Sequence, residues 1–242
     1  SHRYIAMWSG PRNISTAMMR SWGNRADTFV CDEPFYAHYL NETRLEHPGM
    51  EEVIGSQPTD WREVVRWLTG PVPGNKPIFY QKQMSHHLLP TIGREWLDTV
   101  TNAFLIRDPQ DMILSLSKVL SLVRLVDTGM PQQLEIFEQV RRRKGQLPAV
   151  VDARDVQNHP EIVLPKLCEV LEVDFDPAML HWLPGRRETD GIWAKYWYAN
   201  VEKTTCFEPY QSKSEPTPEA LRPILNECIE IYNRLAEFRI TA

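Results

Sequence analysis

The sequence predicts an α/β fold in which a central, mostly parallel sheet of about five strands lies between two layers of helices. Short apolar runs bounded by turn residues alternate with segments of helical spacing, as in a doubly wound sheet. The first apolar run leads directly into a glycine-containing turn and then into a helical pattern. The linker-like stretches at 71–77 and 211–219 do not separate two core-sized halves, so we expect one domain over residues 1–242.

The predicted elements follow from the spacing of apolar residues. Strands buried on both faces form near-continuous apolar runs, and such runs occur at 4–8, 28–31, 77–81, 103–107 and 149–153. Three predicted helices each have one apolar face. Its positions are Ile14, Met18 and Trp22 in the first, Met112, Leu116, Val119 and Val123 in the second, and Leu221, Leu225, Cys228, Tyr232 and Leu235 in the third. Asp108 and Pro109 suit the N-cap and first turn of the second helix.

Charge and composition narrow the classes of function. The net charge of −5 is the opposite of the basic surface that a dedicated nucleic-acid-binding protein needs, so we expect no such partner. No run of about 18 apolar residues occurs, and the first residues lack a secretory-signal pattern, so we expect no membrane segment and a cytoplasmic location. Four separated cysteines without a CxxC pair fit reduced thiols better than a metal or disulfide scaffold.

Residues 9–16, SGPRNIST, form a predicted anion-binding turn between the first strand and its helix. Unpaired N–H groups at a helix start, together with the helix dipole, favour an anion there. Gly10 allows close backbone approach, Ser15 and Thr16 offer hydroxyl donors, and Arg12 offers a planar charged fork. The alternative is an ordinary strand–turn–helix junction without a ligand. The candidate phosphate-binding residues are Gly10, Pro11, Arg12, Asn13, Ile14, Ser15 and Thr16.

Cations follow two further predicted strands. The nucleotide-triphosphatase pattern GxxxxGK[ST] is absent from the loop, whereas Lys82 and Arg107 end the runs PIFYQK and AFLIR. Ligands of open α/β sheets bind at the carboxyl ends of the strands. We therefore expect Arg12, Lys82 and Arg107 to converge on a polyanionic ligand, with no metal.

Three motifs in order resemble one family. SGPRNISTAM is similar to a 5′-phosphosulfate loop, and IRDPQDMILSLSKV matches a 3′-phosphate motif in which Arg107 precedes Ser115 by eight residues. VVDARDVQNHPEIVLPKLCEVLEVDFDP resembles the strand-then-helix stretch downstream of them. Together, over residues 5–178, the chain resembles sulfotransferases that use 3′-phosphoadenosine-5′-phosphosulfate (PAPS) and release adenosine 3′,5′-bisphosphate (PAP).

The resemblance implies a P-loop-type fold and a nucleotide site. It implies that the loop 10–16 holds the 5′-phosphosulfate and that Arg107 and Ser115 hold the 3′-phosphate, without metal. From the residues alone, Ser115 has a second interpretation, as a serine that bonds the preceding helical turn. The family's RKGxxGxW clamp is missing, and Arg186 and Arg187 are candidates to replace it.

The resemblance also points to two candidates for the general base. Some branches use a glutamate at the end of the second strand, here Glu33, although Asp32 and Glu33 also suit a capping role. Others use a lysine-x-histidine, but Met84 stands at the histidine's position after Lys82, and His86 and His87 follow. We expect Glu33 to be the base, with His86 the second choice, and Lys82 and Arg12 to neutralise the transferring group.

The sequence therefore predicts a sulfotransferase that acts on a hydroxyl or amine. A small-molecule or glycan-type acceptor is expected, and its identity leaves no trace in the sequence. Two alternatives stay open: a nucleotide-dependent kinase, and a PAP- or PAPS-binding protein without turnover.

Overall fold

Five parallel strands form the central sheet in the order β2-β3-β1-β4-β5. The computed structural model describes residues 2–242, and its strands are β1 Arg3–Ser9, β2 Thr28–Asp32, β3 Ile78–Met84, β4 Thr101–Ile106 and β5 Ala149–Asp152. After β1 the chain places β2 at one edge and returns to β3 beside β1, and it then adds β4 and β5 on the other side of β1. The order thus reverses at β1, which is where an open α/β sheet leaves a crevice for ligands. The predicted fold class and all five strands are confirmed.

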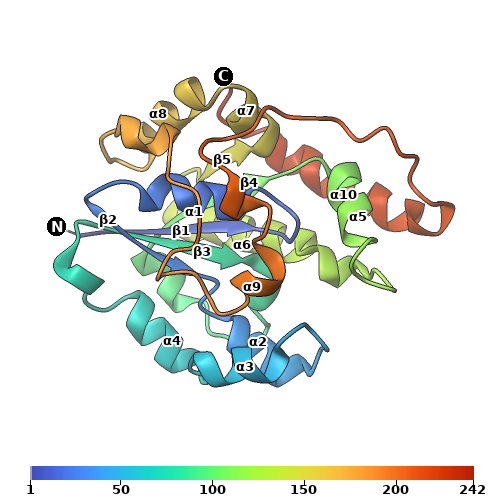
Figure 1. Ribbon diagram of the computed structural model, residues 1–242, viewed down its shortest axis with the longest axis horizontal. Coiled ribbons are helices and arrows are strands. Elements are labelled where there is room, and N and C mark those ends of the chain that lie inside the picture. The colour runs from blue at the N-terminus through green and yellow to red at the C-terminus, as the bar shows by residue number, and fades with distance from the viewer. Residues whose placement is uncertain (1) are drawn as a thin grey trace.

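Helices cover both faces of the sheet (Figure 1). One face packs against α1 Ser15–Gly23, α7 Ala153–Asn158 and α8 Pro160–Val170. The other packs against α4 Trp61–Leu68, α6 Met130–Lys144 and α10 Arg222–Ala236. Within β1, Ile5 and Met7 enter the first core, and Ala6 and Trp8 enter the second. This two-sided burial explains why the strands are apolar without alternation.

The remaining helices are shorter. They are α2 Tyr36–Thr43, α3 Met50–Ser56, α5 Pro109–Leu116 and α9 Ala194–Trp197, with 3₁₀ turns at Pro73–Asn75, Ser85–His87, Glu95–Thr99, Leu125–Thr128, Pro177–Leu180, Val201–Lys203 and Glu219–Leu221. The predicted stripe of the C-terminal helix is buried at Leu225, Cys228 and Leu235. Within residues 2–242, no helix has the length and apolar character needed to cross a membrane.

Two predicted boundaries were wrong. The predicted second helix was to include Val119 and Val123, but α5 ends at Leu116. The Ser117 hydroxyl donates to the Leu114 carbonyl at 3.0 Å, a side-chain bond that competes with helix continuation. β3 is longer than predicted and runs to Met84, because Gln83 and Met84 still pair with Trp8 and Ser9. Lys82 therefore lies inside the strand instead of ending it.

Candidate active site

A cavity of about 670 Å³ opens beside the loop that joins β1 to α1. Loop residues Pro11 to Thr16 line one part of it, and Glu33, Lys82, His86, Arg107 and Ser115 line other parts. Apart from Gly10 and the two arginines at 186 and 187, the residues that the sequence nominated for donor binding or for chemistry thus meet at one cavity. Two of these residues, Arg12 and Ser115, are 103 residues apart in the chain.

Gly10 does not line this cavity. A Cβ atom at Gly10 would lie 2.5 Å from the carbonyl oxygen of Thr128, closer than real Cβ contacts. The glycine is needed because the segment before α6 packs against the loop backbone. We expected Gly10 to let the loop backbone approach a ligand closely. In the structure the backbone at Gly10 instead approaches the Thr128 carbonyl of the same protein.

Arg12 and Ser115 meet at the head of the loop. Arg12 has a φ of 56°, a left-handed conformation that is uncommon outside glycine. Its Nε donates to the Ser115 Oγ at 2.8 Å, and Arg107 donates to the Arg12 carbonyl. Asn13 fixes the turn, since its Nδ2 donates to the Leu105 carbonyl at 3.1 Å and its Oδ1 accepts from Ile14 N–H at 2.7 Å. Ser115 thus faces the loop instead of only bonding its own helix.

Arg12 and Arg107 lie close together without a direct carboxylate partner in the part of the chain that the structure describes. No ion pair joins Arg12 or Arg107 to a carboxylate anywhere in residues 2–242. Burial lowers the pKa of Arg107, and the neighbouring Arg12 charge adds to that shift although Asp111 opposes it. The arrangement favours binding of an anion, whose charge would relieve the repulsion between the two guanidinium groups.

Lys213 is a further cation that the sequence did not single out. Burial lowers the pKa of its amine, and the charges of Arg107, Lys118 and Arg12 lower it further, so Lys213 lies beside this cluster. Its Nζ is 3.4 Å from the Asp111 carbonyl. In the sequence, Lys213 is simply a lysine in a linker-like segment, a pattern that indicates a solvated loop and not a ligand-binding residue.

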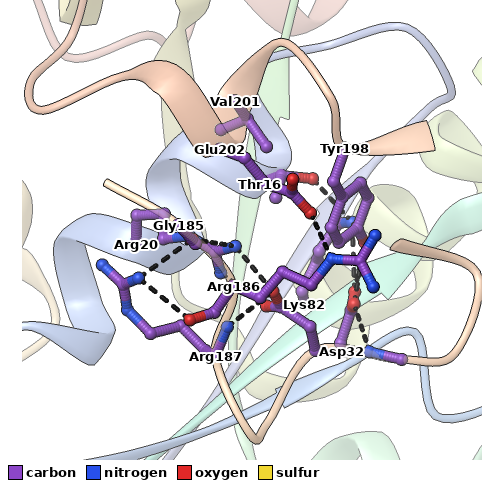
Figure 2. A network of polar contacts seen from close by, with 12 residues as sticks. Thr16, Arg20, Asp32, Lys82, Gly185, Arg186, Arg187, Tyr198, Val201 and Glu202 are labelled. Carbon is purple, nitrogen blue, oxygen red and sulfur yellow. Dashed lines mark hydrogen bonds and ion pairs between the residues drawn. The ribbon is translucent and has the colours of Figure 1, made fainter. Parts of the chain in front are cut away.

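Arg186 and Arg187 do not take part in the cluster. Arg186 donates to Glu202 at 2.8 Å, and Arg187 donates to the Gly185 carbonyl at 3.0 Å (Figure 2). Neither side chain lines the cavity. The suggestion that these two arginines replace the missing clamp was wrong, because they fix the loop that carries them.

Lys82 is buried beneath the loop, with 2% of its side chain exposed. Its Nζ contacts four oxygen atoms: Thr16 Oγ1 at 2.9 Å, Asp32 Oδ1 at 3.1 Å, Glu33 Oε1 at 3.0 Å and Tyr198 OH at 2.6 Å. Figure 2 draws the contacts to Thr16, Asp32 and Tyr198. Burial alone would lower the pKa of Lys82, but the Asp32 and Glu33 charges raise it well above 10.5, so the side chain is an ammonium ion.

Asp32 and Glu33 have different surroundings. Asp32 accepts from Tyr198 OH at 2.8 Å and from Gly191 N–H at 3.0 Å, in addition to Lys82. Glu33 lines the cavity, and among the described residues Lys82 is the one partner of its carboxylate. Burial raises the pKa of Glu33, and the Lys82 charge partly opposes this shift. The capping alternative is wrong, since α2 has no side-chain cap at its N-terminus.

The two histidines line the cavity as neutral rings. Burial lowers the pKa of His86 to about 3, and it lowers that of His87 well below 6.5. The His87 ring stacks on Tyr36 and Tyr39, with ring centroids 4.8 and 4.6 Å apart. A ring with so low a pKa accepts a proton poorly near neutral pH, which favours Glu33 over His86 as the base.

Side chains that ligate metals are scattered over the fold. In the part of the chain that the structure describes, residues 2–242, no three His, Cys, Asp or Glu side chains are grouped so that they could hold a metal ion. Cys31, Cys168, Cys206 and Cys228 are all free thiols.

Comparison with solved structures supports the fold. The sulfotransferase domain of the Synechococcus PCC 7002 olefin synthase superimposes with a TM-score of 0.61 at 18% identity, over 96% of this chain and 94% of that domain. A sulfotransferase domain from the curacin biosynthetic pathway gives 0.56 at 16% identity, over 100% and 99%. A sulfotransferase from Alicyclobacillus acidocaldarius gives 0.54 at 10% identity, over 99% and 98%.

Comparison of sequences identifies the family. Two Arabidopsis thaliana proteins, named branched-chain-amino-acid aminotransferase-like proteins 1 and 2, are each 32% identical over 231 residues. The match covers 96% of this chain but only 41% of each plant protein. A family model described as a sulfotransferase domain matches residues 3–236. The chain therefore belongs to the sulfotransferase domain family.

Proposed function

We propose that this domain transfers a sulfuryl group from PAPS to a hydroxyl or amine of a small-molecule or glycan acceptor. One observation carries the proposal. The cavity combines two guanidinium groups that form no ion pair with a carboxylate within residues 2–242 with a buried ammonium ion and a carboxylate of raised pKa. A doubly anionic donor and a proton-yielding acceptor require this combination of charges.

In this proposal PAPS binds to the part of the cavity that Arg12 and Arg107 line. The N–H groups and hydroxyls of the loop 11–16 suit the 5′-phosphosulfate, since they lie at the start of α1. Arg107 and Ser115 suit the 3′-phosphate, with Lys213 as the flanking cation. Arg12 lies between the two, with its side chain on Ser115 and its backbone in the loop.

The proposed reaction is an in-line displacement. The acceptor oxygen or nitrogen forms a bond to sulfur while the bond from sulfur to the bridging phosphate oxygen breaks. Glu33 takes the acceptor proton and later releases it to water, and PAP leaves with the bridging oxygen. Lys82 and Arg12 stabilise the charge that develops on that oxygen and on the sulfonate.

The alternatives are less well supported. A P-loop kinase needs the loop lysine to hold its triphosphate, and here the carboxylates of Asp32 and Glu33 at the end of β2 are engaged with Lys82. The aminotransferase-like names belong to plant proteins of which this chain covers 41%, and the family model describes the covered part as a sulfotransferase domain. The four free thiols favour a reducing compartment such as the cytoplasm.

Calorimetric titration tests the donor assignment. We expect PAP to bind at micromolar strength without metal, and Arg107→Ala to weaken binding at least about tenfold, which is about 1.4 kcal/mol. Arg186→Ala, which removes a half-exposed arginine outside the cavity, is the matched control and should leave binding unchanged. Binding of magnesium-ATP but not PAP would replace the sulfotransferase proposal with the kinase. Binding of PAP without sulfuryl transfer from PAPS to any acceptor would favour the protein without turnover.

A further inference from the structure

Lys82 has one more oxygen partner than it has protons. An ammonium group donates three hydrogen bonds, whereas four oxygens lie within 3.1 Å of Lys82 Nζ. The Tyr198 hydroxyl carries one proton, which it donates to Asp32, so it accepts from Lys82. Trp193 Nε1 donates to the same hydroxyl at 3.2 Å, which completes the bonding of Tyr198. Lys82 thus shares its remaining two protons among Thr16, Asp32 and Glu33.

Asp32 and Glu33 depend on Lys82 to different degrees. Asp32 keeps two other donors, Tyr198 OH and Gly191 N–H, if the ammonium moves away. Glu33 has no second donor to its carboxylate within residues 2–242, and only 12% of its side chain is exposed. A ligand that attracts Lys82 therefore removes the stabilisation of the Glu33 anion, whereas Asp32 keeps its two other hydrogen bonds.

Tyr198 is held firmly in place. The segment that carries it is anchored by Asp190, whose carboxylate forms a bidentate pair with Arg20 of α1 at 2.5 and 2.7 Å. Both side chains of that pair are buried. The Tyr198 ring also lies under the ammonium, with Nζ 4.7 Å from its centroid. These contacts fix the Tyr198 hydroxyl next to the Lys82 ammonium group.

We infer that Asp32 and Tyr198 are positioning residues that hold Lys82 so that it passes from Glu33 to the donor phosphate, and that Glu33 becomes the stronger base only when the donor is bound. This inference rests on the proposed function. Glu33 lies at a φ of 43°, a strained left-handed conformation that directs its carboxylate to Lys82 and the cavity. Donor binding and base strength are thereby coupled through one ammonium group.

Proton uptake on PAP binding tests the coupling without any acceptor. Titrations at pH 6 in two buffers of different ionisation enthalpy measure the protons taken up per PAP bound. The wild type should take up more protons than Glu33→Gln, because the 5′-phosphate of PAP attracts Lys82 and part of the Glu33 carboxylate becomes protonated at this pH. Equal uptake by the two proteins, with PAP bound to both, would overturn the inference alone.

Tyr198→Phe tests the positioning role. It keeps the ring beneath Lys82 but removes the hydroxyl, so the ammonium stays with the two carboxylates. We expect the uptake to fall to that of Glu33→Gln, kcat to fall about tenfold (about 1.4 kcal/mol) and the dissociation constant of PAP to change less than about threefold.

Tyr232→Phe is the matched control. Tyr232 also donates to a buried carboxylate, that of Asp152, but it lies outside the cavity. This variant should lose stability and keep the wild-type uptake. If Tyr198→Phe behaved like Tyr232→Phe in uptake and kcat, the inference would be wrong. Failure of PAP to bind the wild type would instead overturn the proposed function.

Discussion

The Nε atom of Arg12 lies 2.8 Å from the Oγ atom of Ser115, although 103 residues separate them. The bond joins the loop after β1 to the second turn of α5. It places a permanent cation beside a hydroxyl that is otherwise free to bind an anion. We therefore expect Ser115→Ala to weaken PAP binding by about 0.5–1.5 kcal/mol, the usual contribution of one hydrogen bond. Calorimetry measures this, and Ser117→Ala, on the same segment but outside the cavity, should leave affinity unchanged.

Lys213 should strengthen nucleotide binding mainly through charge. Its neighbours Arg107, Lys118 and Arg12 are all cations, so an anion near them gains from each further positive charge. Lys213→Ala should weaken PAP binding several-fold at low salt and less at high salt, because ions screen the exposed part of the interaction. Titrations at two ionic strengths measure the effect, and equal losses at both would contradict it. Lys166→Ala, on α8, is the matched control.

Substitution of Glu33 and substitution of His86 should reduce kcat to very different extents if Glu33 is the general base. Glu33→Gln should reduce kcat about 100-fold or more, the usual contribution of a general base. His86→Gln should reduce it only a few-fold, because a ring with a pKa of about 3 is already neutral and weakly basic. In the wild type, kcat should fall as the pH drops through the raised pKa of Glu33, above the ordinary 4.5. Release of PAP from PAPS, measured against pH, separates the two, and the reverse ranking would assign the proton transfer to His86.

Local patterns in the sequence predicted most of the fold, and they pointed to many of the residues that line the cavity. The five strands and the loop from Pro11 to Thr16 were predictable because burial on both faces and a helix start each leave a signal within a few residues. The role of Tyr198 was not, since it contacts Lys82 across 116 positions of the chain. The end of α5 was missed because a serine side-chain bond overrode a continuing apolar stripe.

Gly10 should be important for stability more than for ligand binding. A methyl group at this position would meet the Thr128 carbonyl at 2.5 Å, and both backbones would have to shift. We expect Gly10→Ala to lower the free energy of unfolding by about 1–3 kcal/mol, as overpacking does. Gly55→Ala is the contrasting control, since a methyl group there would meet no neighbouring atom within 4 Å and an alanine in helix α3 should stabilise by up to about 1 kcal/mol. Denaturant unfolding measures both, and equal stability of the two variants would contradict the packing argument.

The buried histidines should make the fold sensitive to acid. Burial lowers the pKa values of His86 and His87 in the folded state, so the unfolded chain binds protons at these sites first as the pH falls below about 6.5. Stability is therefore full above that pH and is lost below it, by up to about 1.4 kcal/mol per pH unit for each histidine. His87→Phe keeps an aromatic ring between Tyr36 and Tyr39 but removes one titrating group. Urea unfolding at pH 6 and pH 5 should show a smaller loss for this variant than for the wild type. A loss of equal size would mean that the His87 ring already carries its proton in the folded protein.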